Sequence, residues 1–370
     1  MPVPGPTPTC WPPCAPRACW RCRPPTTSCA CCRRSSLDPK RSTPPFRSSR
    51  GPLRVWPGRP PDMTRMPPIR HFTDLAALDR ATLRAILDHG AALKARRGDP
   101  GDRRLLVGRT LALIFERNST RTRVSFEVGM RELGGDVLVL TGDALQLSRG
   151  ETMADTARVL SRYVDAIMLR TDSPEKLDDL ARHASVPVIN GLTSLSHPCQ
   201  IMADLMTVEE RRGSLDGLVA TWVGDGNNVA VSWIKAATHF GFEMRLACPE
   251  GFDPPAQVLA WAQAQGAAVT LTRDPEAAVA QADCVITDTW MSMSTSEDER
   301  ERRARVFAAY QVNQALMDRA KDSALFLHCL PAHRGEEVTS EVIDGPQSVV
   351  WDEAENRLHA QKAILAWCLS

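Results

Sequence analysis

Residues 115–127, which read FERNSTRTRVSFE, combine hydroxyl and guanidinium groups in a short polar turn. An apolar run of strand length precedes the turn, and apolar side chains at helical spacing follow it. Ser119 is a natural N-cap for that helix. Arg121 and Arg123 would then lie in its first turn, where the helix dipole disfavours a cation by roughly 0.3 to 1 kcal/mol. A multiply charged anion bound at the same helix end resolves this conflict, and phosphate is the leading candidate.

The hydroxyl groups of this turn also allow a simpler interpretation. Ser119, Thr120 and Thr122 could serve only to cap the helix, as most Ser/Thr clusters before helices do. Capping alone gives no reason to place cations at the positive end of a helix. The arginines therefore favour an anion site.

Arg170, His197 and Gln200 are a second group of polar side chains at predicted strand ends. Arg170 directly follows a strand that is predicted to end at Leu169. His197 and Gln200 lie three apart at the start of a helix, with Pro198 at a position suited to proline. Alone, the arginine is explained as a solvated charge and the histidine as a cap. Together the three side chains could donate to one carbonyl oxygen, as in an oxyanion site.

The segment 223–229, which reads VGDGNNV, resembles half of a dinucleotide-binding fingerprint. Glu250 follows this segment at about the sequence separation expected for the acidic residue that binds the ribose in such a site. Val229 stands where the third glycine is required, so the match is weak. The two asparagine amides of the segment suit a carboxylate or an amino group instead.

Two later segments carry further polar groups. Asp288 and Ser292, in DTWMSM, follow a predicted strand and would bring a carboxylate and a hydroxyl to a cleft. His328, Cys329 and His333, in HCLPAHR, suggest zinc ligands, and Cys329 alone suggests a nucleophile. Their spacing matches no common zinc set, and no cysteine-enzyme signature surrounds the thiol. We expect the thiol and nearby carbonyl groups to line the cleft.

The elements that must position these groups alternate between strand and helix. Thr73 is predicted to cap a first helix that ends around Gly98. A first series has strands at 111–115, 137–140, 166–169 and 186–189, and helices at 120–133, 151–163 and 174–183. After a helix at 198–211, a second series has strands at 219–223, 244–247, 268–271, 284–287 and 324–327, and a final helix covers 353–367.

This pattern predicts an α/β protein with two doubly wound domains, each with a parallel sheet, bridged by helices. The predicted domains are residues 63–212 and 213–352, and residues 353–370 form a helix that closes back toward the first domain. Ligands are expected at the carboxyl ends of the strands and in the cleft between the domains.

Residues 1–62 differ in composition from the rest of the chain. They hold 16 of the 28 prolines and 7 of the 12 cysteines, with 11 Lys/Arg against 2 Asp/Glu. We interpret them as a disordered extension. The remainder has net charge −8, which gives no indication of nucleic-acid binding. The chain has no apolar run long enough to span a membrane, and its five scattered remaining cysteines favour a reduced, cytoplasmic protein.

The motifs STRTR, HPCQ, GDGNN, DTWMSM and HCLP, in this order, resemble the aspartate/ornithine carbamoyltransferase family, and within it the members that use ornithine. The resemblance covers roughly residues 66–370. It implies a carbamoyl-phosphate-binding first domain and an amino-acid-binding second domain. It also implies a homotrimer, or a multiple of trimers, with sites at subunit interfaces.

The resemblance further implies the roles of individual residues. Phosphate binding would fall to Ser119, Thr120, Arg121 and Thr122. The carbamoyl carbonyl would be polarised by Arg170, His197 and Gln200. Further contacts to carbamoyl phosphate or near the attacking amine would come from Cys329, Leu330, Arg357 and, inserted by a neighbouring subunit, Gln146. Ornithine would be bound by Asn228, Asp288, Ser292 and Met293, with the Asp288 carboxylate on the α-amino group.

The implied reaction moves the carbamoyl group of carbamoyl phosphate to the δ-amine of L-ornithine, giving L-citrulline and phosphate in arginine biosynthesis or catabolism. Carbamoyl phosphate carries its own leaving group, so orientation and charge stabilisation suffice, and neither a metal nor an organic cofactor is expected. Arg117 and Ser294 depart from the family pattern, which commonly has Lys and Gly there.

Three alternatives remain at this stage. Another amine, such as aspartate or a modified ornithine, could be the acceptor. The aspartate-specific members of the family, however, have HPLPR in place of the HCLP motif and lack DTWMSM. The half fingerprint suggests an NAD-dependent dehydrogenase, which the STRTR turn disfavours. A catalytically silent binding module is the third.

Overall fold

The computed structural model of the protein describes residues 68–141, 150–291 and 297–370. Residues from Met66 to Ser370 form one compact unit. Several predictions fall outside the described residues: the extension 1–62, the loop residue Gln146, and Ser292, Met293 and Ser294 of the DTWMSM segment.

The first sheet has four parallel strands in the order β2-β1-β3-β4. Its strands are β1 (Thr110–Phe115), β2 (Asp136–Thr141), β3 (Ala166–Arg170) and β4 (Val188–Leu192). The helices that connect or cover them are α1 (Arg80–Ala95), α2 (Thr120–Glu132), α3 (Met153–Leu160) and α4 (Pro174–His183). Short 3₁₀ turns lie at Leu75–Ala77 and Asp102–Arg104.

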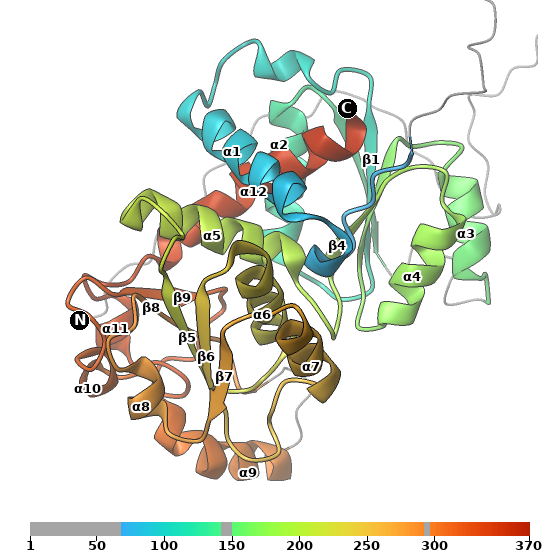
Figure 1. The fold of residues 1–370 in the computed structure, drawn as a ribbon. Coiled ribbons are helices and arrows are strands. Elements are labelled where there is room, and N and C mark those ends of the chain that lie inside the picture. The colour runs from blue at the N-terminus through green and yellow to red at the C-terminus, as the bar shows by residue number, and fades with distance from the viewer. Residues whose placement is uncertain (1–67, 142–149, 292–296) are drawn as a thin grey trace, which may run out of the picture. The chain divides into compact units, whose positions relative to one another are not determined.

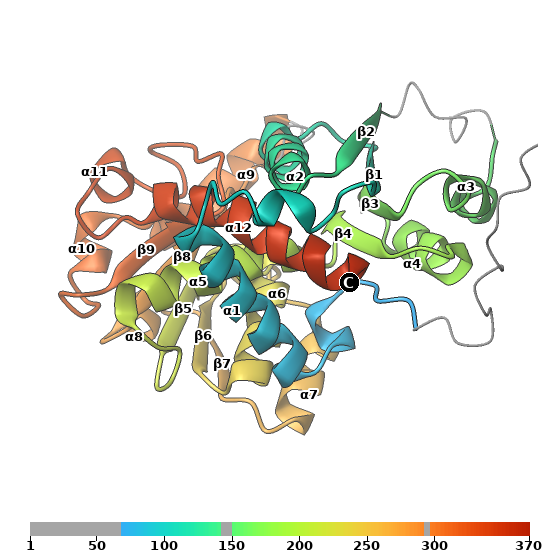
Figure 2. The same ribbon diagram turned by 90° about the horizontal axis from the view of Figure 1, so that it is seen from above.

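Both faces of this sheet are covered by helices. Leu113 of β1 belongs to the same apolar cluster as Phe126 of α2, whereas the next residue, Ile114, belongs to a second cluster with Ala157 of α3 and Leu177 of α4. This alternation follows from the two-residue period of a strand. Figures 1 and 2 accordingly show α1 and α2 on one side of the sheet and α3 and α4 on the other.

The second sheet has five parallel strands in the order β7-β6-β5-β8-β9. Its strands are β5 (Val219–Val223), β6 (Glu243–Ala247), β7 (Val269–Thr272), β8 (Cys284–Thr287) and β9 (Leu325–His328). The associated helices are α6 (Asn228–Phe240), α7 (Ala256–Ala264), α8 (Pro275–Val279), α9 (Glu297–Phe307), α10 (Gln314–Met317) and α11 (Ser340–Ile343), with a 3₁₀ turn at Ala308–Tyr310.

Helices α5 (Pro198–Arg212) and α12 (Val350–Leu369) connect the two sheets. Helix α12 packs against α5, α1 and α2, and its start contacts β9 of the second sheet. Its path alongside α1 and α5 is visible in Figure 2. Nearly every residue of the first three turns of α5 is buried, as expected for a helix covered on all sides. The predicted α/β class with two parallel sheets bridged by helices is confirmed.

Some predicted element ends were wrong. Thr73 caps no helix, because Asp74 caps the first 3₁₀ turn, the extended residue Leu78 interrupts the helical pattern, and Asp79 caps α1 separately. The fourth strand begins at Val188 rather than at residue 186, because Pro187 has no N–H to donate to the neighbouring strand β3. The final helix begins at Val350, three residues before the predicted start.

Candidate active site

The N-terminus of α2 has the predicted geometry. Ser119 is the N-cap, and its Oγ accepts a hydrogen bond from the backbone N–H of Thr122 at 3.4 Å. Thr120 and Arg121 open the helix, so the guanidinium group does lie in the first turn. The predicted cap at Ser119 is confirmed.

Thr122 is the point on which the cations converge. Its side chain is fully buried, and its Oγ1 accepts from Arg170 Nη1 at 3.2 Å and from Arg357 Nη2 at 2.9 Å. Arg357 lies on α12, 235 residues further along the chain. Burial lowers the pKa of Arg170 to about 10, and the positive charges of Arg357 and Arg121 contribute to this shift. These cations therefore repel one another in the absence of an anion.

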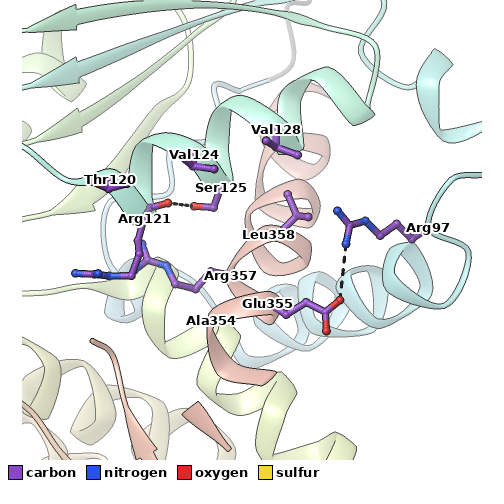
Figure 3. A pocket seen from close by; sticks show the side chains of 10 residues that line it. All are labelled: Arg97, Thr120, Arg121, Val124, Ser125, Val128, Ala354, Glu355, Arg357 and Leu358. Carbon is purple, nitrogen blue, oxygen red and sulfur yellow. Dashed lines mark hydrogen bonds and ion pairs between the residues drawn. The ribbon is translucent and has the colours of Figure 1, made fainter. Parts of the chain in front are cut away.

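A cavity of about 450 Å³ opens beside this helix end. Figure 3 shows Arg121 of α2 and Arg357 of α12 next to each other along its wall. At the other end of the cavity, Arg97 pairs with Glu355 across 3.7 Å, and apolar side chains of α2 and α12 lie between. The cavity wall therefore changes from cationic near the N-terminus of α2 to apolar along its outer face.

His197 and Gln200 lie at the start of α5, and both side chains are buried. His197 occupies the N-cap position, but its ring makes no capping hydrogen bond, and its Nδ1 has no partner among the described residues. Burial lowers its pKa well below the usual value, and Arg357 and Arg170 add to this shift. The imidazole is therefore neutral near pH 7 and can donate a single N–H.

The side-chain amide of Gln200 is not oriented to donate its N–H groups to a substrate carbonyl. Its Nε2 donates to Asp204 Oδ1 at 2.8 Å and to Glu353 Oε1 at 2.7 Å. Both amide hydrogens are used in these bonds, and Oε1 has no partner among the described residues. In this arrangement Gln200 offers an acceptor rather than a donor, so donation by all three side chains to one oxygen stays a prediction that would require the Gln200 amide to give up one of these two bonds.

Asp288 follows β8 and is almost fully buried. Its carboxylate accepts from Asn227 Nδ2 at 2.8 Å, from the Thr289 N–H at 2.8 Å and from Cys329 Sγ at 3.2 Å. Three donors hold it in one orientation, which suits a carboxylate that receives an ammonium group.

Cys329 is held as a protonated thiol. Burial raises its pKa well above the usual value, and the Asp288 carboxylate raises it further. The thiolate that a nucleophile or a zinc ligand requires is therefore disfavoured. Both ring nitrogens of His328 already have partners: Nδ1 accepts from the Leu330 N–H at 2.9 Å, and Nε2 lies 3.1 Å from Glu337 Oε1. The thiol lining the site is the interpretation that this geometry favours.

In the GDGNN loop, Gly226 packs directly against the chain segment at residues 252–254. A side chain at Gly226 would meet the backbone nitrogen of Pro254 at 2.3 Å, so this glycine is required by close packing. Its N–H donates to the Phe252 carbonyl at 2.8 Å. The glycine spacing that suggested a dinucleotide-binding loop therefore has a structural explanation.

Asn228 does not reach Asp288 through any hydrogen bond in the described part of the chain. Its amide donates instead to the Thr193 carbonyl at 2.7 Å, which links the start of α6 to the segment after β4. The neighbouring Asn227 both caps α6 and bonds to Asp288. The sequence analysis gave the two asparagine amides of this segment as suited to a carboxylate, which agrees with the bond from Asn227 to Asp288, but it did not predict the capping role of Asn227.

Asp204 and Glu353 were also missed. They lie four residues after Gln200 on α5 and at the start of α12, and both bind its amide. Asp204 could have been found from its helical spacing to Gln200. Glu353 gave no local signal, because it is brought in from 153 residues away.

Comparison with known proteins identifies the class that this fold and site define. Residues 70–210 match the family model for the aspartate/ornithine carbamoyltransferase carbamoyl-P binding domain, and residues 216–368 match the model for the Asp/Orn binding domain of the same family. The chain belongs to the aspartate/ornithine carbamoyltransferase family.

Individual relatives refine this placement. The chain is 58% identical to ornithine carbamoyltransferase of Brucella abortus (strain 2308) over 301 residues, which cover 81% of this chain and 96% of the relative. The solved ornithine carbamoyltransferase of Pyrococcus furiosus is similar with a TM-score of 0.77 and 51% identity, over 80% of this chain and 96% of that one. The Thermus thermophilus enzyme gives a TM-score of 0.75 at 39% identity, over 83% of this chain and 100% of that one.

Proposed function

We propose that the protein transfers the carbamoyl group of carbamoyl phosphate to the δ-amine of L-ornithine, forming L-citrulline and phosphate. The observation that carries the proposal is the set of guanidinium groups gathered at the N-terminus of α2, where Arg170 and Arg357 both donate to Thr122. A dianionic phosphate relieves their mutual repulsion and accepts from the free N–H groups of the helix end. The names of the relatives support ornithine as the acceptor.

The first region would bind and activate carbamoyl phosphate. Ser119, Thr120, Arg121 and Thr122 hold the phosphate, and Arg357 neutralises it from α12. Arg170 and the neutral imidazole of His197 stabilise the oxyanion that forms on the carbamoyl carbonyl. The bond from carbon to the bridging oxygen then breaks, and phosphate leaves with its charge already matched by the cations.

The second region would bind ornithine. Asp288 pairs with the α-amino group, and Asn228, Ser292 and Met293 complete the binding site. Cys329 and Leu330 lie near the attacking δ-amine. This amine attacks in its neutral form, and the proton that it loses as the new C–N bond forms leaves on the departing phosphate. The proposed domains are residues 63–212 for carbamoyl phosphate and 213–352 for ornithine, with 353–370 returning to the first domain.

We further propose a homotrimer, or a multiple of trimers, that acts in the cytoplasm in arginine biosynthesis or catabolism, with Gln146 of one subunit completing the site of the next. Within the described residues, none of the helices combines the length and apolar character needed to cross a bilayer.

An active site shared between two subunits predicts complementation between Arg121→Ala and Gln146→Ala chains that are unfolded and refolded together. A head-to-tail ring regenerates one of the three sites in each mixed trimer, and about three quarters of the trimers are mixed when the two chains combine at random in equal amounts. About a quarter of wild-type activity should therefore return. Confirmed mixed trimers without activity would place Gln146 elsewhere.

The direct test is an assay for citrulline from carbamoyl phosphate and ornithine, run beside an assay for carbamoyl-aspartate with aspartate as the acceptor. Both use the full chain and a chain without residues 1–62. We expect citrulline alone, at equal rates for the two chains. Carbamoyl-aspartate as the main product would overturn the acceptor, and the absence of both products would overturn the proposal.

A further inference from the structure

Behind the candidate active site lies a pair of carboxyl groups that the reaction as described does not use. Asp204 of α5 and Glu353 of α12 are 2% and 1% exposed, and both accept from the single nitrogen Nε2 of Gln200. One nitrogen bonded to both oxygens brings the two carboxyls within a few ångströms of each other. The other oxygen of Glu353 accepts from the backbone N–H of His328 at 2.9 Å.

Two buried carboxylates at this separation cannot both be ionised without a large cost. Among the described residues, the titratable groups that interact with the pair include Arg357 on α12, Cys284 on β8 and Cys329 after β9, and of these three Arg357 alone is a cation. His328 adds its backbone N–H. The indole N–H of Trp233 on α6 also lies beside Asp204, without hydrogen-bond geometry. Burial raises the pKa of Asp204 to about 7 and that of Glu353 well above its usual range. The pair therefore holds one shared proton near neutral pH.

The hydrogen-bond requirements of the two carboxyls differ. Glu353 must accept two N–H groups, one on each oxygen, from Gln200 and from His328. Asp204 accepts from Gln200 with Oδ1 only, so its second oxygen is free to share the proton with Glu353. An amide could therefore replace Asp204 but not Glu353.

The binding of both amide hydrogens leaves Gln200 Oε1 without a partner among the described residues, in a side chain that is 0% exposed. The guanidinium groups at this site, those of Arg121, Arg170 and Arg357, are donors only. Carbamoyl phosphate presents an amino group, which needs an acceptor. A polar atom buried without a partner is costly, so its retention indicates a ligand that donates to it.

We infer that Asp204 and Glu353 are positioning residues, a singly protonated carboxyl pair that holds Gln200 by its amino group and so fixes its amide oxygen as the acceptor for the amino group of carbamoyl phosphate. This inference rests on the proposed function. The pair also connects the carbamoyl site to β9 of the second sheet, through the bond to His328.

The test compares two isosteric variants, Asp204→Asn and Glu353→Gln. In Asp204→Asn the introduced amide can accept from Gln200 and donate to Glu353, so kcat/KM for carbamoyl phosphate should stay within about threefold of wild type. In Glu353→Gln the introduced amide has to turn its own amino group toward one of the two N–H groups. The Gln200 amide is then no longer held, and kcat/KM should fall by about tenfold or more. Thr207→Ala, an equally buried polar change on α5 whose hydroxyl bonds to Ala203 and Asn356 rather than to Gln200, is the control with unchanged activity.

A specificity measurement separates positioning from loss of structure. Acetyl phosphate carries a methyl group where carbamoyl phosphate has its amino group. The preference for carbamoyl over acetyl phosphate, measured by competition, should narrow in Glu353→Gln and in Gln200→Ala, while the affinity for inorganic phosphate stays unchanged. The double variant Glu353→Gln/Gln200→Ala should be no worse than Gln200→Ala alone, because both changes act through one amide.

Three results would overturn the inference in an enzyme whose wild-type form makes citrulline. They are multiplicative losses in the double variant, an undiminished preference over acetyl phosphate in Glu353→Gln, or equal losses in Asp204→Asn and Glu353→Gln. A wild-type enzyme that makes no citrulline would instead refute the proposed function.

Discussion

The N-terminus of α2 and the surroundings of Asp288 differ in how far their charged groups are balanced by neighbouring groups of the protein. At α2, arginines from three elements are held near one threonine hydroxyl and remain in mutual repulsion. At Asp288, a single carboxylate is already surrounded by three donors from within the second domain. The first region is therefore incomplete without an anion, whereas the second is stable by itself and adds a cationic ligand to an existing network. We expect substitutions in the first region to have the larger kinetic effects.

Arg121→Ala should produce the largest loss. Removing one guanidinium from the phosphate site should lower kcat/KM for carbamoyl phosphate by about 100-fold or more, because its charge acts on the leaving group in the transition state. Arg123→Ala is the matched control. This residue lies in the same helix, is half exposed and pairs with Glu127 at 3.5 Å. Steady-state kinetics in which the two variants behave alike would break the distinction between the site and the helix surface.

Asp288→Asn should act on the other substrate. The change keeps the shape but removes the charge that pairs with the α-amino group, so KM for ornithine should rise by about 10- to 100-fold. Equilibrium binding of carbamoyl phosphate should be unchanged. Asp253→Asn, which breaks an exposed pair with Arg273, serves as the control. Normal ornithine saturation in Asp288→Asn would remove this carboxylate from the acceptor site.

The origin of these features explains how much of them could be predicted. Ser119, Pro198 and the parallel strands follow from local spacing and capping, and the sequence alone located them. The contact of Arg357 with Thr122 and that of Glu353 with Gln200 join residues 235 and 153 positions apart. No local pattern encodes such pairs, because they depend on how α12 packs across α5 and α2. The resemblance to a family indicated Arg357, but only the folded structure brings Glu353 to the site.

Asn227 allows the capping role and the site role to be separated. Asn227→Ser keeps a cap on α6 but loses the donor to Asp288, so we expect KM for ornithine to rise about threefold with little change in Tm. Asn227→Ala should raise KM similarly and also lower stability by about 1 kcal/mol. A Ser variant with normal KM would show that Asp288 needs no support from this amide.

The pH dependence should also differ between the two regions. Burial lowers the pKa of His197 well below 6.5, and the pKa of Arg170 is about 10, so neither changes charge appreciably between pH 7 and 9. His197 and Arg170 should therefore add no pH dependence to the dissociation constant of carbamoyl phosphate over this range. Turnover should rise with pH, since the δ-amine, with a free pKa of about 10.4 like lysine, must lose its proton before it attacks. A flat turnover profile would show that this chemistry does not limit the rate.

The central claim is that these two regions form one site across which the carbamoyl group moves. A bisubstrate analogue, with a phosphonoacetyl group on the δ-nitrogen of ornithine, tests it by titration calorimetry with the wild-type, Arg121→Ala and Asp288→Asn proteins. We predict tighter binding to the wild type than either substrate shows alone, and weaker binding, by about tenfold or more, in each variant. Undiminished affinity in either variant would contradict a single site built from both regions.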